Sequence, residues 1–552
     1  MKRNTLTTAV LAGLTGVAGM AGVANAVNVN PDGLGQVLLF PYYSARGGND
    51  TFVHITNTSE RGKAVKIRFI EALNSREVLD FNIYMSPFDV WTAAITATDE
   101  GGAKMITRDT TCTVPYIFGD FDGEQEFLTF EFTGDKADGG PTGVERTASG
   151  YIEVIEMGTL LPVPAEEPGL GDEGIVAWAT KHVAGVPRNC GAHVLAWTDF
   201  QGGDSPLPWS WLETPNFGFD TELGASGGLF GSASIINVAD GTMFSYDATA
   251  IDGFFAQGDM DHVNPGDLEP DLRSGTSAIS NVFVNGDVVS HDWDEVGTLQ
   301  AVNAVLTQRQ IFNEYITDPE IGARTEWVMT FPTKRFHTDV AGGFTDEVIP
   351  PFTSTWTNPE AGVSPACEAF AFTTPTTDEE YFATDGSRAF DREEGPGVTP
   401  EDDPDPIPPV VSPRPPADDP DPIEPDVFLL CREANVVRFA LGEDEIPSAS
   451  EILKEPWREG TGLGFSNFAL PFDAGWVRFD LGVIGVSDDI RTTLTGINTA
   501  TGATEALEGL PVVGFAVTTY TNGQLASGAL ANYGGTFSHR GSRSVVSVEI
   551  DD

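Results

Sequence analysis

The feature that most constrains the fold is a regular alternation of apolar and polar residues early in the chain. Two segments, 63–69 and 79–83, place apolar side chains at every second position. A period of two is typical of a β-strand with one buried face. We therefore expect an antiparallel sheet that forms one half of a β-sandwich, with further strands at 36–40 and 51–56. The apolar positions are Val65, Ile67, Phe69, Leu79, Phe81 and Ile83, and the polar positions between them are Lys66, Arg68, Asp80 and Asn82.

The same pattern recurs along the chain and predicts a mainly β protein. We expect antiparallel, Ig-like β-sandwich domains, with a few short helices in a central mixed region. Among the less regular segments, 127–132 is predicted as a strand and 298–316 as a helix, because its apolar residues keep roughly helical spacing. The expected parts are a signal peptide at 1–26, an N-terminal β-sandwich at 27–160, a mixed α/β region at 161–345 and a C-terminal β-rich domain at 346–552.

The first 26 residues have the composition of a secretory signal. Lys2 and Arg3 give a charged start, Leu11–Val23 is short, apolar and rich in Gly and Ala, and residues 24–26 fit the small-x-small rule for cleavage. No later stretch approaches the ~20 apolar residues of a membrane-spanning helix. We expect an exported protein, extracellular or on the cell surface, with the periplasm as the alternative location. After signal cleavage it should have no transmembrane segment.

The chain is strongly acidic. Its 82 Asp and Glu residues face 30 Lys and Arg residues, which gives a formal net charge of −52. Loss of Lys2 and Arg3 with the signal leaves 28 basic residues and a mature charge of −54. Such a charge repels phosphate backbones, and we therefore exclude nucleic acid as a partner. It attracts cations such as Ca²⁺, although a hydrated acidic surface suited to a saline habitat explains the same composition.

Four cysteines remain in the mature chain, namely Cys112, Cys190, Cys367 and Cys431. An even number in an oxidising compartment indicates two disulfides. Three pairings are possible. Pairing of sequence neighbours, Cys112 with Cys190 and Cys367 with Cys431, is expected if the chain builds its domains in order.

The segment at 393–426 is rich in proline and acidic residues, and the sequence Asp-Asp-Pro-Asp-Pro-Ile occurs in it twice. Prolines and like charges favour an extended chain. Cys367 and Cys431 lie on either side of this segment. We therefore predict a surface loop that leaves and re-enters one domain, in place of a linker between two domains.

Several short segments carry a resemblance to one family: Gly35–Tyr43, Glu71–Phe81, Ser86–Trp91, Asn313–Tyr315, Trp327–Lys334, Gly514–Phe515 and Ala531–Tyr533. They are similar to an uncharacterised family of exported proteins from Gram-negative, often marine, bacteria. The resemblance runs over most of the mature chain and implies a secreted or cell-surface protein. None of these segments is a catalytic signature, so the resemblance implies no activity.

One motif matches a catalytic template. Gly224-Ala-Ser-Gly-Gly228 fits G-x-S-x-G, the nucleophile elbow of many hydrolases. That elbow requires a buried strand before the serine and a helix after it. Segment 216–222 is a poor candidate for a buried strand, and two consecutive glycines start a helix poorly. We predict a flexible glycine loop in which Ser226 is inert, and we assign no catalytic residue.

Short acidic turns are the only candidates for a metal site. Asp120, Asp122 and Glu124 alternate in one turn, and alternate carboxylates can share a Ca²⁺ ion. The turn does not continue into a full EF-hand loop, so an ordinary aspartate turn is the stronger interpretation. Ca²⁺ is accordingly the one cofactor that the sequence raises.

Aromatic residues gather near acidic ones between positions 197 and 220. Trp197, Trp209 and Trp211 lie within this stretch, together with Asp199 and Asp220. Aromatic faces beside carboxylates are typical of a sugar-binding or glycosidase cleft. Aromatic residues packed into a core explain the same composition, and we favour this second interpretation.

Together these patterns predict an exported, non-enzymatic structural or adhesion protein of the cell surface or extracellular matrix. Its partners would be other surface proteins or glycans. One alternative is a secreted hydrolase that acts on glycans through the 197–220 region. Another is a module that binds carbohydrate or Ca²⁺. Acidic residues that converge in an open cleft would favour the hydrolase, whereas a buried aromatic cluster would favour the structural protein.

Overall fold

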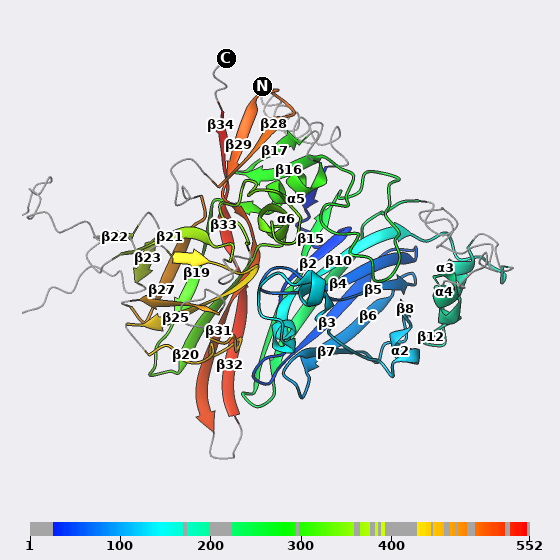
Figure 1. The fold of residues 1–552 in the computed structure, drawn as a ribbon, viewed down its shortest axis with the longest axis horizontal. Helices are drawn as coiled ribbons and strands as arrows, with labels where there is room; N and C mark the ends of the chain where they lie inside the picture. The colour runs from blue at the N-terminus through cyan, green and yellow to red at the C-terminus, as the bar shows by residue number, and fades with distance from the viewer. Residues whose placement is uncertain are drawn as a thin grey trace, which may run out of the picture.

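Largely antiparallel β-sheets with a few short helices make up the part of the chain that the structure describes, as predicted (Figure 1); only β25 and β26 pair in parallel in this part. The structure is a computed structural model. It describes residues 26–168, 174–197, 223–293, 297–357, 365–375, 381–384, 388–391, 428–442, 445–457, 464–470, 472–482, 492–524 and 530–548. None of the helices in these ranges is long and apolar enough to cross a membrane.

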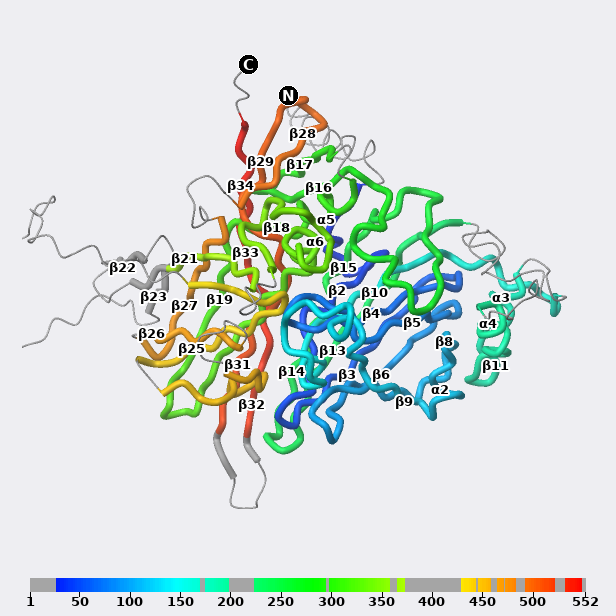
Figure 2. The backbone as a smooth tube through the Cα atoms, viewed as in Figure 1, coloured from blue at the N-terminus to red at the C-terminus, as the bar shows by residue number. Residues whose placement is uncertain are grey.

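Two sheets face each other across the largest apolar core and form the first sandwich (Figure 2). The first sheet runs in the order β1 (Asn28–Val29), β15 (Thr249–Asp252), β2 (Val37–Ser44), β10 (Ser149–Thr159), β4 (Lys63–Glu71), β5 (Glu77–Met85) and β8 (Cys112–Val114). The second runs in the order β14 (Thr242–Asp247), β13 (Leu229–Asn237), β3 (Asn49–Asn57), β6 (Val90–Ala97), β7 (Ala103–Ile106) and β9 (Glu124–Glu126). Val65, Ile67 and Phe69 enter this core, as their spacing predicts.

Strands from distant parts of the sequence complete both sheets of the first sandwich. β13 pairs with β3 from Leu229 opposite Asn57 to Asn237 opposite Asn49, and β15 pairs with β2. β13 also pairs with β14 in a hairpin. Hydrogen bonds therefore cross the predicted domain boundary at residue 160.

A second sandwich lies against the first. One of its sheets contains β26 (Ser466–Leu470), β25 (Ala434–Leu441), β20 (Ala323–Thr330), β31 (Val513–Gln524) and β32 (Leu530–Ser538). The other contains β22 (Tyr381–Thr384), β21 (Glu368–Pro375), β27 (Ala474–Asp480), β19 (Gln310–Ile316) and β33 (Arg540–Ser542), with β23 (Arg388–Asp391) and β24 (Phe428–Leu430) joined to it. β20 places Trp327 in the core between these sheets and Val328 in the core of the first sandwich. One sheet thus serves both cores.

A smaller sheet covers a third core near the two ends of the described chain (Figure 1). It contains β16 (Ile279–Val284), β17 (Asp287–Asp292), β28 (Thr493–Asn498), β29 (Thr504–Glu508) and β34 (Ser544–Ser547). Helix α5 (Thr298–Leu306) packs into this core, and the two-residue strands β18 (Thr307–Gln308) and β30 (Leu510–Pro511) pair beside it.

Two secondary-structure predictions are wrong. The helix expected at 298–316 ends at Leu306, and its second half is strand β19, in which Ile311, Asn313 and Tyr315 alternate inward. The spacing of 312 and 316 is compatible with a helix, but pairing with β27 decides the outcome. The strand expected at 127–132 is also absent, because Phe130–Phe132 forms a short 3-10 helix, η1.

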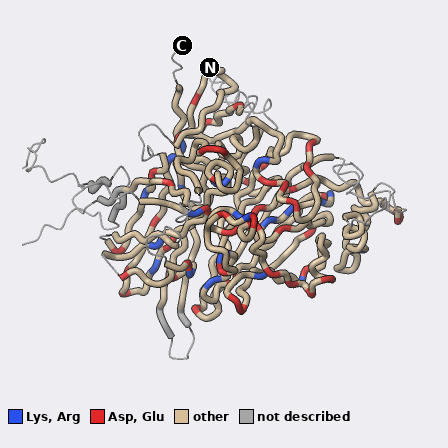
Figure 3. Tube along the Cα trace, viewed as in Figure 1, with Lys and Arg blue, Asp and Glu red and all other residues tan. Residues whose placement is uncertain are grey.

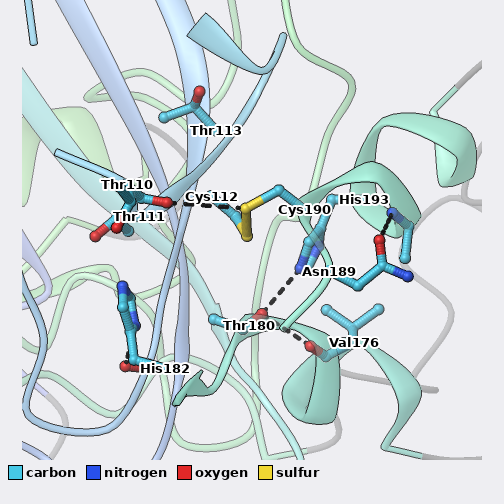
Figure 4. Close-up of a disulfide and its surroundings, with 12 residues drawn as sticks. Thr110, Thr111, Cys112, Thr113, Val176, Thr180, His182, Asn189, Cys190 and His193 are labelled. Carbon is cyan, nitrogen blue, oxygen red and sulfur yellow. Dashed lines mark hydrogen bonds between the residues drawn. A yellow bond between two sulfur atoms is a disulfide. The ribbon is translucent and has the colours of Figure 1, made fainter. Parts of the chain in front are cut away.

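The first predicted disulfide, between Cys112 and Cys190, is present. Figure 4 shows Cys112 at the start of β8 and Cys190 at the start of helix α4 (Cys190–Ala196). Helix α3 (Ile175–Thr180) and the small hairpin of β11 (His182–Val183) and β12 (Val186–Pro187) lie beside α4. The bond fastens this helical segment to the edge of the first sandwich.

The second predicted disulfide, between Cys367 and Cys431, is also present. Next to it β21 pairs with β24, with Glu368 opposite Leu430. The segment at 393–426 lies outside the described residues. Its two flanks are joined both by the disulfide and by strand pairing, which agrees with a loop that leaves and re-enters one sheet.

The sequence predicts that β4 has one buried face, and this prediction is wrong, because its polar positions are buried as well. All nine residues of β4 are buried, including Lys66 and Arg68 on the face opposite the sandwich core. Arg68 Nε lies 2.6 Å from Glu77 Oε2 and its Nη1 lies 2.5 Å from Glu153 Oε2. Lys66 Nζ lies 2.5 Å from Asp80 Oδ2 and also donates to the carbonyl oxygen of Asp267. Figure 3 shows acidic and basic positions interleaved through this part of the molecule.

A second group of buried charges joins the two sandwiches. Arg76 Nη2 from the β4–β5 turn lies 2.6 Å from Asp339 Oδ2, which follows helix α6 (Arg335–Thr338). Glu433, next to β25, is also buried, and its backbone N–H donates to the carbonyl of Ala72. Burial raises the pKa of Glu433 to about 8, and the nearby Lys334 opposes this shift only in part.

This raised pKa predicts how stability depends on pH. The folded protein binds a proton at Glu433 more tightly than the unfolded chain does, so this contribution to stability is complete below about pH 4.5 and is lost as pH rises to about 8. The side chain in Glu433→Gln stays neutral at every pH. The free energy of unfolding of this variant, relative to wild type, should therefore rise by on the order of a few kcal/mol across that range. Urea unfolding from pH 5 to 8.5 measures the difference. The exposed Glu320→Gln is the control, and a constant difference for Glu433→Gln would contradict the assignment.

Candidate functional site

The serine of the G-x-S-x-G motif lies in a loop that leads into β13. Ser226 is exposed, and β13 begins three residues later, at Leu229. The residue after the serine, Gly227, has φ of 73°, and a Cβ atom there would lie 2.8 Å from Asp252 Oδ1. The motif is thus followed by a strand, not by the helix that a nucleophile elbow requires. The segment is thus a glycine loop, as predicted, but the hydrogen bonds described next hold it in place, so the expected flexibility is not observed.

Two buried charged residues hold this loop in place. Lys63 Nζ, at the start of β4, donates to Ser226 Oγ at 2.7 Å and to Glu156 Oε1 at 2.7 Å. The carboxylate of Glu156, on β10, also accepts the backbone N–H groups of Ser226 at 3.0 Å and Gly227 at 2.8 Å. Thr159 Oγ1 bonds to both Glu156 and Ser226. We call Lys63, Glu156, Thr159 and Ser226 the loop clamp.

The loop clamp resembles a serine–lysine pair in composition but differs from one in its hydrogen bonds. A lysine that activates a serine accepts the hydroxyl proton, which requires a neutral amine. Lys63 instead forms a fully buried ion pair with Glu156, and its Nζ donates to Ser226. The carboxylate of Glu156 accepts four hydrogen bonds, which hold it in place within the fold. This geometry holds the loop in place.

Lys63 and Glu156 were not singled out in the sequence. The sequence does indicate that Glu156 is unusual, because Glu153 and Glu156 interrupt an otherwise apolar run from Tyr151 to Met157 in β10. Carboxylates inside a buried strand need cationic partners. The partner of Glu156 is 93 residues away in sequence, so only the fold identifies it.

The predicted metal ligands do not form a site. Glu124 Oε2 lies 2.7 Å from Lys104 Nζ, and this ion pair lowers the pKa of the carboxyl. Asp120 ends helix α2 (Ile117–Asp120), and the backbone carbonyl of Asp122 accepts from Arg108. Across the described ranges, no group of three or more His, Cys, Asp or Glu residues could hold a metal ion.

Of the three tryptophans considered as ligand contacts, only Trp197 is described; Trp209 and Trp211 lie outside the described residues. Trp197 is buried in a small core with Cys112 and Cys190. Its Nε1 donates to the hydroxyl of Tyr84 at 2.8 Å, and its ring packs edge to face on His262. Burial lowers the pKa of His262 to about 3, which keeps this histidine neutral. Trp197 thus belongs to a buried aromatic cluster.

Comparison with known proteins adds no assignment: no family model, no curated protein and no solved structure matches the chain. The chemistry of the candidate residues therefore rests on their geometry alone.

The loop clamp predicts a small loss of stability when its exposed residue, Ser226, is changed and a large loss when its buried lysine, Lys63, is changed. Ser226→Ala removes one hydroxyl and should cost about 1 kcal/mol of unfolding free energy, with no change in any esterase signal of the purified protein. Lys63→Met leaves the Glu156 carboxylate buried without its cation and should cost about 3–5 kcal/mol. Denaturant unfolding and hydrolysis of a p-nitrophenyl ester measure both effects.

The matched control is Ser245→Ala, which changes another exposed serine, on β14. A loss of ester hydrolysis in Ser226→Ala but not in Ser245→Ala would establish Ser226 as a nucleophile and contradict the structural role.

Proposed function

We propose that this chain is an exported, non-enzymatic structural or adhesion protein of the cell surface or extracellular matrix. The observation that carries the proposal is the loop clamp. The one catalytic motif in the sequence places its serine in a fixed loop, where Lys63 is paired with Glu156 and serves as a donor.

Other features support the same proposal. Two disulfides hold peripheral segments to the sheets, which suits a protein that functions in an oxidising compartment. The mature charge of −54 keeps such a protein hydrated and repels nucleic acid. The resemblance to exported proteins of Gram-negative bacteria agrees with this location. The glycan-hydrolase alternative depends on three tryptophans that line a cleft. One of them, Trp197, is buried in an apolar cluster and is not available for such a cleft.

The location is tested by raising an antibody against the purified mature protein and applying it to intact and fractionated cells that produce it. We expect labelling of intact cells or of the matrix, loss of the signal after protease treatment of intact cells, and a mature form that lacks the first 26 residues. A cytoplasmic protein serves as the lysis control. Recovery of the chain in the cytoplasm with residues 1–26 retained would contradict the proposal.

A further inference from the structure

An apolar pocket of about 390 Å³ opens beside strand β5, and none of the loop-clamp residues lines it. Its lining includes Pro115, Ile117, Leu128, Phe130 and residues 77–81 of β5 itself. Leu128 and Phe130 are 53% and 65% exposed at its rim. Exposed large apolar side chains around a concave apolar site are typical of a binding surface.

The part of β5 that lines the pocket includes an unpaired stretch of strand edge. On its outer side β5 pairs with β8 only from Asn82 onward, where Asn82 lies opposite Val114. At the other end, the carbonyl of Val78 accepts a hydrogen bond from the backbone N–H of Leu128. Between these points, no strand of the described chain pairs with the outer edge of β5. Because alternate residues of a strand direct their backbone groups to the same side, the N–H and C=O of Asp80 point into this gap.

The side chains around the gap provide binding contacts without catalytic groups. The pocket lining contains no serine, threonine, cysteine or histidine. Its two carboxylates on β5 are already engaged, Glu77 by Arg68 and Asp80 by Lys66. At the rim, Lys136 Nζ lies 4.5 Å from the centre of the Phe130 ring and pairs with Glu131, which holds that ring in position.

We propose that this pocket binds an extended segment of a partner protein, which adds its backbone to the free edge of β5 and inserts large apolar side chains between Leu128 and Phe130. A strand edge recognises peptide groups, which an apolar small molecule lacks, so the occupant is a polypeptide. The net charge of the protein favours a segment with basic residues on either side of its apolar ones. The inference rests on the proposed function, since it names the contact through which an adhesion protein would act.

The probe is a fluorescein-labelled peptide, Lys-Phe-Thr-Phe-Lys, whose two phenylalanines lie on one side when it is extended. Fluorescence anisotropy measures its affinity for the full mature protein in 0.15 M salt. Saturable binding should weaken at least about tenfold with Leu128→Asp combined with Phe130→Asp, because the apolar rim is lost. It should weaken by a similar factor when the threonine nitrogen of the peptide is methylated, because that removes a backbone donor.

The matched control is Phe283→Asp, which changes an apolar residue of β16 that is 62% exposed and remote in sequence. Its affinity for the peptide should equal that of wild type. Equal binding to wild type and to the rim variant would overturn the site. Equal binding of the methylated peptide, or binding of an apolar dye in place of either peptide, would overturn the strand-addition mode. Cell fractionation tests the proposed function independently, because a cytoplasmic location would refute that function whatever the peptide does.

Discussion

The structure depends on buried ion pairs along one strand, β4. Lys66 and Arg68 project from the face opposite the sandwich core, where ions without partners would be costly. Each therefore requires a carboxylate, and Glu77, Asp80 and Glu153 supply them from the neighbouring strands β5 and β10. Even so, burial raises the pKa of Glu153 to about 7, which shows how strongly this face is shielded from water. Over Lys66 and Asn82 the shielding comes from the loop at 262–268, whose carbonyls accept hydrogen bonds from both side chains.

Much of the fold follows from local sequence patterns. Alternation of apolar residues locates β3, β4 and β5, because each of these strands has a face that must enter a core. The cysteine pairing also follows, since neighbouring cysteines are the first to meet when a chain folds in order. Alternation does not reveal what covers the second face of a strand. From the sequence alone Lys66 is expected to face solvent, but the loop at 262–268, about 200 residues later, lies over it.

The failures of prediction have the same physical cause. The segment from Gln310 to Ile316 satisfies a helical spacing and a strand spacing equally, and only its pairing with β27 distinguishes them. At the site, the glycine pair after Ser226 correctly indicates a poor nucleophile elbow, but Lys63 and Glu156 are too far away in sequence to be connected with it. Leu128 and Phe130 carry the alternation of a strand, and the structure leaves both at the rim of a pocket because the chain turns into η1.

Arg68 is a buried cation, and its removal would leave two buried carboxylates, Glu77 and Glu153, without their ion-pair partner. The measurement that tests it most directly is denaturant unfolding of Arg68→Met, alone and combined with Glu77→Gln and Glu153→Gln. The single variant should lose about 3–5 kcal/mol of unfolding free energy, and neutralising both carboxylates should restore most of that loss. The exposed Arg108→Met is the control and should change by less than about 0.5 kcal/mol. A loss of less than about 1 kcal/mol for Arg68→Met, with no recovery in the combined variant, would contradict the account.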